Sequence, residues 1–305
     1  MDESQAKRRC GFVALIGAPN AGKSTLLNQL VGSKISIVTH KVQTTRATIR
    51  GIALHDNAQI IFVDTPGIFR PRKGKRLERA MVDTAWGGAR DADLVALLVD
   101  ATKGITDETT QILARLTAIR QPKVLVLNKI DAVDREVLLA FAKEATDAAD
   151  FVATYMVSAL TGDGCVDLLG AFAKDVPEGP WLYPEDQISD LPLRNVAAEI
   201  TREKMLLRLH EELPYTSTVE TEAWQERPDG SVRIEQTIYV AREGHKKIVL
   251  GKGGQTIKAI SQAARIEISD ALERKAHLFL FVKVREKWAD DPERYREMGI
   301  DFPRD

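Results

Sequence analysis

The stretch Gly17-Ala18-Pro19-Asn20-Ala21-Gly22-Lys23-Ser24 decides the fold of the first half of the chain. It fits the pattern GxxxxGK[ST] and lies between an apolar run, 12–16, and a helical stretch, 25–31, that begins at Thr25. Glycines let backbone N–H groups surround phosphate oxygens, Lys23 supplies an ammonium for the β- and γ-phosphates, and Ser24 offers Mg²⁺ a hydroxyl. Such a match arises by chance in roughly one chain in a hundred of this length. The stretch therefore predicts a phosphate-binding loop.

Short apolar runs alternate with longer amphipathic stretches on both sides of this loop. They are continuously apolar, which is typical of buried strands in a parallel sheet. The predicted strands are Phe12–Ile16, Ile49–Leu54, Ile60–Asp64, Leu94–Asp100, Val124–Asn128 and Val152–Val157. The alternation predicts an α/β fold with a mainly parallel sheet.

A second short motif follows the predicted strand 60–64. Asp64, Thr65, Pro66 and Gly67 stand at its carboxyl end, where ligands bind in open α/β sheets. Asp64 can hold Mg²⁺ through water, and the Gly67 N–H group can approach a γ-phosphate because no side chain intervenes. We expect this loop, with Ile68 after it, to respond to hydrolysis.

Two further motifs indicate which base is bound. Asn128, Lys129 and Asp131 end the predicted strand 124–128. One carboxylate accepts the adjacent N1–H and N2–H₂ donors of guanine, a pair that adenine lacks, so a buried Asp131 would reject adenine. The motif Ser158-Ala159-Leu160 follows the last run and offers a backbone amide to guanine O6. Four motifs in order, each at a strand end, reduce the chance interpretation below about one per cent and predict a GTPase domain.

The composition changes after this domain. Four prolines in 176–193 favour a linker, so we divide the chain into a nucleotide-binding domain at 1–176, a linker at 177–193 and a second domain at 194–305. In the second domain, the pattern predicts a helix over 196–213, a hairpin with its turn at 228–230, two helices around a glycine turn, and a strand over 278–284. Because the last strand is apolar on both faces, we expect it to be central, with Phe279 and Phe281 in the core.

The glycine turn Gly251-Lys252-Gly253-Gly254 gives this α+β domain a function. The order of elements matches a KH domain of type II topology, which clamps single-stranded nucleotides at such a turn. Between Arg242 and Lys258, five basic residues and one acid give a local charge of 5 − 1 = +4. Candidate RNA contacts combine the turn with its basic and apolar neighbours: Lys246, Lys247, Ile248, Gly251, Lys252, Gly253, Gly254 and Lys258. Of the apolar residues nearby, Ile248, Val249, Ile257 and Ile260, we expect most to pack in the core and one or two to line the groove that receives bases, with core packing preferred for any single one. The alternative is a protein-docking module with a solvated lysine face.

These motifs resemble the translation-factor-like class of P-loop GTPases and, over the whole chain, its Era family. The resemblance extends to Gln43-Thr44-Thr45-Arg46 and, in the second domain, to the stretches 202–204, 212–215, 251–254, 282–284 and 288–291. It implies GTP and GDP as ligands, binding near the 3′ end of 16S ribosomal RNA, and a role in maturation of the small ribosomal subunit.

The resemblance also frames how GTP would be hydrolysed. A loop hydroxyl from Thr44 or Thr45 should close on Mg²⁺, and we favour Thr45, which gives Ser24, Thr45 and Asp64 as metal ligands. Ras-like enzymes carry a glutamine where this chain has Ile68, so intrinsic turnover should be slow. Asn20 resembles the residue that coordinates K⁺ in related GTPases, and an equal alternative is a turn residue that satisfies loop backbone. The expected catalytic residues are Lys23, Asn20, Thr45 and Gly67.

Composition sets the remaining expectations. The net charge of −1 gives no global attraction to nucleic acid, and Cys10 and Cys165 have neither a disulfide framework nor a metal spacing. No apolar run is long enough for a signal core or a membrane span, so we expect a cytoplasmic protein without a stable oligomer. Peripheral membrane contact through the basic second domain is an open alternative. Two other functions also remain open: an RNA-binding module whose nucleotide only stabilises the fold, and a GTPase acting on tRNA or at a membrane.

Overall fold

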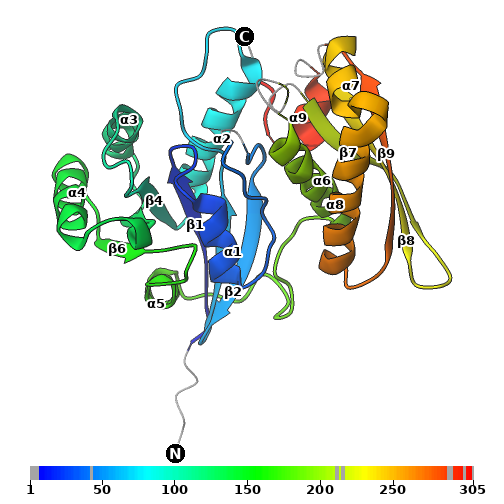
Figure 1. The fold of residues 1–305 in the computed structure, drawn as a ribbon. Helices are drawn as coiled ribbons and strands as arrows, with labels where there is room; N and C mark the ends of the chain where they lie inside the picture. The colour runs from blue at the N-terminus through cyan, green and yellow to red at the C-terminus, as the bar shows by residue number, and fades with distance from the viewer. Residues whose placement is uncertain are drawn as a thin grey trace, which may run out of the picture. The chain divides into compact units, whose positions relative to one another are not determined.

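The structure is a computed structural model of the chain, drawn in Figure 1. It describes residues 7–41, 44–209, 213, 217–286, 291–297 and 300–303. The chain divides into two compact units. The first unit contains residues 1–36, 45–190 and 298–305, and the second contains 37–44 and 191–297. No helix among the described residues is long and apolar enough to cross a membrane.

The first unit is built on a six-stranded sheet of order β2-β3-β1-β4-β5-β6. All neighbours are parallel except β2 and β3, which are antiparallel. The strands are β1 (Arg9–Gly17), β2 (Ile49–His55), β3 (Ala58–Asp64), β4 (Leu94–Asp100), β5 (Lys123–Asn128) and β6 (Ala153–Val157). β3 and β4 are buried along their whole length, as expected for strands covered on both faces. The predicted mainly parallel α/β fold is confirmed.

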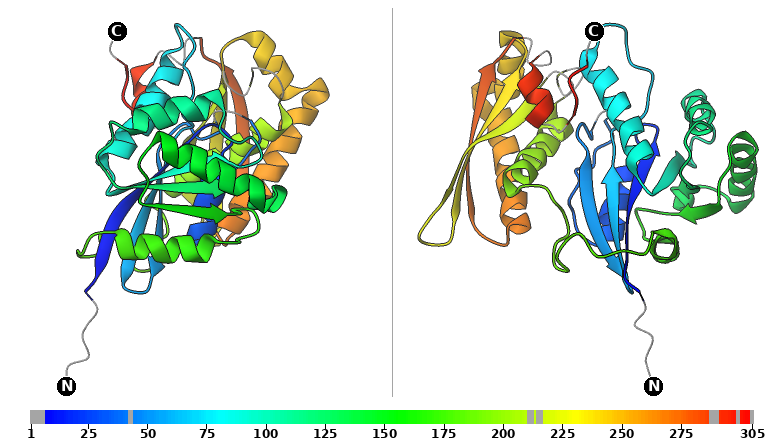
Figure 2. Two further views of the ribbon diagram at one scale, coloured as in Figure 1. Left: turned by 90° about the vertical axis from the view of Figure 1, so that its left-hand side faces the viewer. Right: turned by 180° about the vertical axis from the view of Figure 1, so that it is seen from behind.

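Helices cover both faces of this sheet (Figure 2). The first-unit helices are α1 (Lys23–Val31), α2 (Arg76–Asp91), α3 (Asp107–Leu116), α4 (Arg135–Ala148) and α5 (Cys165–Asp175). Side chains of α2, α3 and α4 pack with those of β1, β4 and β5 in one core that contains Trp86. On α5, Phe172 meets Phe62 of β3 edge to face with ring centroids 5.7 Å apart. The carboxyl ends of the parallel strands thereby lie at one edge of a rigid scaffold.

The segment after α5 is ordered by β3. The side chain of Gln59 is fully buried and accepts the N–H groups of Leu182 at 2.8 Å and Tyr183 at 3.0 Å. Its amide donates to the Tyr183 carbonyl at 2.8 Å, and the indole of Trp181 donates to the Asn57 carbonyl at 3.2 Å. The proline-rich segment therefore runs along the first unit as far as residue 190.

The second unit packs helices on a three-stranded sheet of order β7-β8-β9. β7 and β8 form an antiparallel hairpin, and β9 pairs with β8 in parallel. Its elements are α6 (Leu193–Arg208), β7 (Ser217–Glu226), β8 (Val232–Val240), α7 (Glu243–Leu250), the 3₁₀ turn η3 (Lys252–Gly254), α8 (Gln255–Ala271), β9 (Ala276–Val284) and α9 (Pro292–Glu297). Val232, Ile234, Ile238 and Val240 of β8 are fully buried. The order of elements is that of a type II KH domain.

β9 differs from the sequence prediction. It lies at the edge of the sheet, and β8 is the central strand. Leu280 and Val282 pack against the core, whereas Phe279 and Phe281 are 41% and 48% exposed. The prediction that this strand is central was wrong, because a strand with apolar residues on both faces can still leave one of those faces exposed to solvent. Phe279 is instead partly shielded by the guanidinium of Arg233, 4.6 Å from its ring centroid.

Candidate functional site: a nucleotide loop and a glycine turn

The predicted phosphate loop joins β1 to α1 in the first unit. Gly17 and Gly22 have φ angles of 152° and 95°, which favour glycine. A Cβ on Gly17 would lie 2.4 Å from the Leu98 carbonyl oxygen, and one on Gly22 would lie 2.2 Å from Asn128 Nδ2. Gly17 is therefore required by the approach of a backbone carbonyl, Gly22 by the approach of a side chain, and both by their φ angles. The loop also includes Ala18, Pro19 and Ala21, and it leads into Thr25 at the start of α1.

Lys23 lies under this loop. Its Nζ donates to the carbonyl oxygens of Gly17 at 3.2 Å and Ala18 at 3.1 Å. Burial lowers the pKa of Lys23 to about 8, although the negative charge of Asp64 opposes the shift. The negative charge of a bound phosphate group would raise this pKa again by stabilising the ammonium form.

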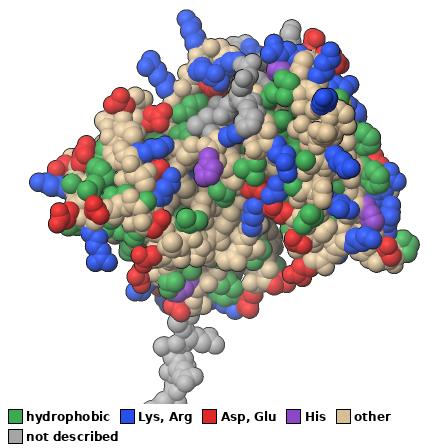
Figure 3. All heavy atoms as spheres, viewed as in Figure 1, with side chains coloured by type: hydrophobic (Ala, Val, Ile, Leu, Met, Phe, Trp, Pro, Cys, Tyr) green, Lys and Arg blue, Asp and Glu red, His purple; other side chains and the backbone are tan. Residues whose placement is uncertain are grey.

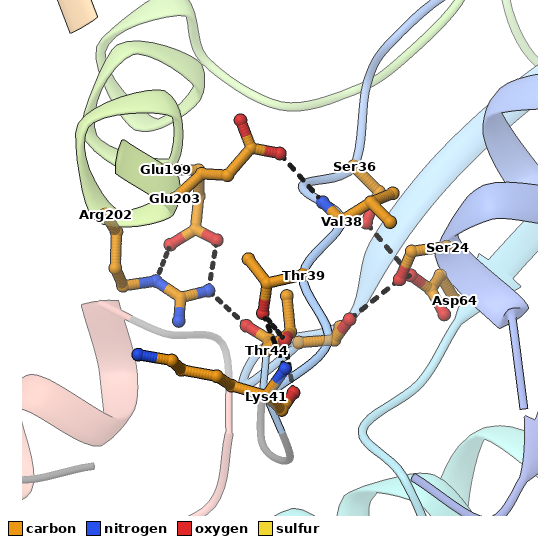
Figure 4. Close-up of polar contacts among 11 residues, drawn as sticks. Ser24, Ser36, Val38, Thr39, Lys41, Thr44, Asp64, Glu199, Arg202 and Glu203 are labelled. Carbon is orange, nitrogen blue, oxygen red and sulfur yellow. Dashed lines mark hydrogen bonds and ion pairs between the residues drawn. The ribbon is translucent and has the colours of Figure 1, made fainter. Parts of the chain in front are cut away.

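The three predicted Mg²⁺ ligands meet at one point beside the loop. Figure 4 labels two of them, Ser24 and Asp64, which lie side by side. Ser24 Oγ lies 2.6 Å from Asp64 Oδ2 and 2.9 Å from Thr45 Oγ1. Asp64 is fully buried, and its Oδ1 makes no hydrogen bond to a described residue. Burial raises the pKa of Asp64, against the effect of Lys23 and the nearby hydroxyls. Because hydroxyl and carboxylate oxygens are the donors that Mg²⁺ prefers, the group fits this ion.

Of the two candidate threonines, the geometry favours Thr45. The Thr44 hydroxyl lies 2.6 Å from Thr39 Oγ1 and donates to the Lys41 carbonyl at 2.7 Å, so it is used elsewhere. Sequence reasoning missed Ser36, which is 1% exposed and donates to Asp64 Oδ2 at 3.0 Å. Ser36 belongs to no motif. It is held in place by the Asn28 side chain, whose Oδ1 accepts the Ser36 N–H group at 2.9 Å, and the sequence does not indicate this contact.

The loop after β3 closes against the phosphate loop. A Cβ on Gly67 would lie 2.9 Å from the Cα of Pro19, so this glycine is also required by close approach. Ile68 is buried and donates its N–H to the Gly17 carbonyl at 3.0 Å. Thr65, before Pro66, is fully buried and donates its hydroxyl to the Leu15 carbonyl at 2.9 Å. The side chain at position 68 is therefore part of the core and offers no polar group to a water.

Asn128 organises the base-recognition loops. Its Nδ2 donates to the Ala21 carbonyl at 2.9 Å, and its Oδ1 accepts the N–H groups of Lys129 at 2.8 Å and Ala159 at 3.0 Å. The Ala159 N–H group is thus occupied and does not serve guanine O6 while this bond lasts. Ser158 is fully buried and Leu160 is 78% exposed, so the motif lies where the core meets solvent.

Lys129 ties this region to a residue that sequence reasoning missed. Its Nζ donates to the Asn20 carbonyl at 2.9 Å and to Asp100 Oδ2 at 2.6 Å. Burial tends to raise the pKa of Asp100, but hydrogen bonds from Lys129 and Thr102 outweigh it and lower the pKa. Asp100 ends a strand as Asp64 does, a signal that could have indicated it. Asp131 lies in the 3₁₀ turn η1 (Ile130–Ala132) and is exposed, whereas the sequence argument took it as a buried carboxylate.

The glycine turn of the second unit joins α7 to α8. Gly251, Gly253 and Gly254 have φ angles of 72°, 59° and 77°. A Cβ on Gly251 would lie 2.2 Å from Thr256 Oγ1, whereas Cβ atoms on Gly253 and Gly254 would meet nothing within 4 Å. Gly251 is therefore required by packing, and the other two leave an open backbone that a ligand can approach.

Basic side chains surround this turn. Lys247, Lys252 and Lys258 are exposed, and Lys246 is half-buried. Figure 3 shows Lys and Arg side chains over the part of the molecule where Figure 1 places α7. Ile248, listed among the candidate RNA contacts, is 53% exposed, while Val249 and Ile260 are fully buried in the core. The exposed lysines and the exposed isoleucine together form a mixed basic and apolar surface beside the open glycine turn.

Comparisons with known proteins agree with both sites. Residues 12–129 match the family described as 50S ribosome-binding GTPase, and residues 212–289 match the KH domain. The GTPase Era of Mesorhizobium japonicum is 68% identical over 293 residues, covering 96% of this chain and 94% of the relative. The GTPase Era of Afipia carboxidovorans is 62% identical over 306 residues, covering 100% and 99%.

Two solved structures are similar over nearly the whole chain. One is Era in complex with MgGDPNP and nucleotides 1506–1542 of 16S ribosomal RNA, with a TM-score of 0.91, 38% identity and coverage of 96% of this chain and 99% of that one. The other is a single-residue variant of Aquifex aeolicus Era bound to GDP and AlF₄⁻, with a TM-score of 0.90, 38% identity and coverage of 95% and 99%. On this sequence identity, domain order and fold, the chain belongs to the Era family of GTPases.

Proposed function

We propose that this protein is a GTP-hydrolysing switch that binds 16S ribosomal RNA near its 3′ end and assists maturation of the small ribosomal subunit. The observation that carries the proposal is the presence in one chain of a complete guanine nucleotide loop and an open, lysine-lined glycine turn. The similar Era structure that holds MgGDPNP and nucleotides 1506–1542 of 16S ribosomal RNA supports both ligands.

In this proposal each loop has a separate task. Lys23 and the N–H groups of the phosphate loop bind the β- and γ-phosphates, and Mg²⁺ is held by Ser24, Thr45 and Asp64. Gly67 brings its N–H group to the γ-phosphate. It can do so because, without a side chain, it packs directly against Pro19 of the phosphate loop. Asp131 accepts the paired donors of guanine. The buried Ile68 leaves the attacking water without a side-chain partner at that position, so we expect a slow intrinsic rate.

RNA binding is assigned to the glycine turn and the basic residues around it. A phosphate backbone can approach Gly253 and Gly254, while Lys246, Lys247, Lys252 and Lys258 neutralise it. Ile248 offers an apolar surface to a base. The protein-docking alternative gives no reason for an open backbone beside four lysines.

Binding of single-stranded RNA with the 3′ sequence of 16S ribosomal RNA tests this proposal. Lys246→Glu and Lys252→Glu should each lower RNA affinity and reduce its salt dependence, while GTP hydrolysis without RNA continues at the wild-type rate. Lys103→Glu, on the exposed surface of the first unit, is the matched control. Unchanged RNA affinity in both variants would overturn the assignment of RNA to this turn.

We also propose that K⁺ assists hydrolysis through Asn20. Asn20 has φ 63°, a left-handed conformation that asparagine tolerates, and this fits the turn role as well as the ion role. Hydrolysis should be faster in K⁺ than in Na⁺ at equal ionic strength if Asn20 helps to hold the ion. Equal rates would leave Asn20 with the turn role alone.

We propose that the protein acts in the cytoplasm, where its RNA partner is made, and that it forms no stable oligomer. Any membrane contact would be peripheral and would use the lysines of the second unit with anionic lipid. Co-sedimentation with phosphatidylserine vesicles, with and without competing RNA, checks this point. Binding that RNA does not displace would place the lipid contact elsewhere.

A further inference from the structure

The loop that leaves α1 in the first unit leads to Ser36, which lies beside the proposed Mg²⁺ ligands. Gly32 ends the helix with φ 75°, and its N–H group donates to the Asn28 carbonyl at 3.0 Å. The side chain of Ile35 is buried and packs against Gly51 of β2, where a Cβ would lie 2.5 Å from Ile35 Cδ1. The backbone before Ser36 is therefore fixed by the end of the helix and by packing on the sheet.

The side chain of Asn28 fixes this loop further. Its Oδ1 accepts the N–H groups of Ile35 at 3.0 Å and Ser36 at 2.9 Å. Its Nδ2 donates to the Ser36 carbonyl at 2.8 Å. Asn28 thus bonds to Ser36 on both sides of its Cα, using the donor and the acceptor of one amide. The direction in which the Ser36 side chain points is therefore set by α1.

The hydroxyl of Ser36 points at the buried carboxylate of Asp64 (Figure 4). It donates to Asp64 Oδ2 at 3.0 Å, and Ser36 is 1% exposed. Ser24 donates to the same oxygen at 2.6 Å, whereas Asp64 Oδ1 makes no hydrogen bond to a described residue. Because two hydroxyls from different parts of the first unit hold Oδ2, the carboxylate cannot turn without losing both bonds. Oδ1 is the oxygen that this arrangement leaves for another ligand.

We propose that Ser36 is a positioning residue for Mg²⁺, whose hydroxyl holds Asp64 Oδ2 so that Oδ1 can accept from a metal-bound water. The inference rests on the proposed function, because it takes Asp64 as a residue of the Mg²⁺ site. Ser24 has a different role, since its oxygen is itself a proposed metal ligand. Hydrogen-bonded partners of metal ligands typically contribute about 10- to 100-fold to metal affinity, so the loss of one hydroxyl should be measurable.

The Mg²⁺ dependence of nucleotide affinity in the full chain tests the inference. Fluorescent GDP is titrated at a series of Mg²⁺ concentrations and in EDTA. GDP is chosen because Thr45 is expected to close around the γ-phosphate, so this residue does not enter the measurement. Ser36→Ala should raise the Mg²⁺ concentration for half-maximal effect about tenfold and leave the affinity in EDTA unchanged. Ser33→Ala, at an exposed serine of the same loop, is the matched control and should behave as the wild type does.

A merely structural role for Ser36 would give a different result. Ser36→Ala would then weaken GDP binding by the same factor in Mg²⁺ and in EDTA and lower the melting temperature. Ser36→Thr keeps the hydroxyl and should recover part of the Mg²⁺ dependence. A wild-type Mg²⁺ dependence in Ser36→Ala, or an equal loss with and without the metal, would overturn the inference. A wild type whose GDP affinity does not respond to Mg²⁺ would instead overturn the metal site of the proposed function.

Asn28 provides an independent test of how Ser36 is held. Asn28→Ala should shift the Mg²⁺ dependence about as far as Ser36→Ala does, because both changes release the same hydroxyl from Asp64. The double variant should show no further shift, since the two residues act in series. Asn28→Ala also removes bonds to the loop backbone, so the Mg²⁺ half-point is compared among variants that have a cooperative thermal transition. Shifts that add in the double variant would overturn the role given to Asn28.

Discussion

Asn128 of β5 donates its side-chain amide to the carbonyl of Ala21, 107 residues earlier, at 2.9 Å. This bond joins the loop proposed to select the base to the predicted phosphate loop. Because the same side chain accepts the N–H groups of Lys129 and Ala159, one asparagine sets the relative positions of the phosphate loop and the two base-recognition loops.

Asn128→Ala should therefore affect both stability and nucleotide binding. The change leaves three polar backbone groups without their partner, and we expect the free energy of unfolding to fall by about 3 kcal/mol. GTP affinity should fall as well, since the loops lose their common tie. Urea denaturation without nucleotide measures the first effect and fluorescent-nucleotide titration the second. Wild-type stability would contradict the central role of this residue.

Asp131→Asn should change base preference without changing stability, because Asp131 is exposed. An amide offers one donor and one acceptor, so it no longer accepts both donors of guanine. It matches xanthine, which carries a carbonyl where guanine carries its amino group. We expect a loss of about 100-fold or more in GTP affinity and a gain for XTP. Competition titrations with both nucleotides provide the measurement, and a variant that still prefers GTP would exclude Asp131 as the base contact.

Nucleotide binding at pH 8.5 should take up protons at Lys23. In the folded protein without nucleotide, burial lowers the pKa of Lys23 to about 8, below its ordinary 10.5. The phosphates restore the ammonium form, so binding should take up about 0.7 proton. Between pH 8 and 10.5 the unfolded chain binds more protons than the folded one, so Lys23 makes the nucleotide-free protein more stable as pH rises through this window.

Calorimetry of Mg-nucleotide binding in buffers of different ionisation enthalpy measures the proton uptake. Lys23→Arg is the control, because arginine stays charged throughout this range. An apparent binding enthalpy that is the same in every buffer would show that Lys23 is already protonated in the free protein.

Gly253→Asp and Gly253→Asn should differ in RNA binding alone. Gly253 has φ 59° and ψ 23°, a left-handed conformation that both residues tolerate, and its position is open. Only aspartate adds a negative charge where a phosphate would approach, so it should lower RNA affinity about tenfold more than asparagine does. Filter binding at two salt concentrations provides the measurement, with melting temperature as the control. Equal affinities would place the RNA backbone away from Gly253.

The nucleotide site could be predicted from sequence because its residues lie in short motifs at strand ends, where a parallel sheet brings them to one edge. The contact of Ser36 with Asp64 and the contacts of α6 with residues 38–44 could not be predicted in this way. Val38 and Glu203, which accepts the Val38 N–H group, are 165 residues apart. The stretch 202–204 contributes to the family resemblance, but nothing in it indicates a contact with Val38. β9 illustrates another limit, since the apolar character of Phe279 and Phe281 carries no information about which strand is central.

The burial of Gln59 beneath residues 181–183 has a consequence for dissecting the protein into fragments. A fragment cut at residue 176 would leave this fully buried amide without its bonds to Leu182 and Tyr183. A separately expressed nucleotide-binding half should therefore extend to Asp190, and inserted sequences or protease sites are best tolerated just beyond that residue.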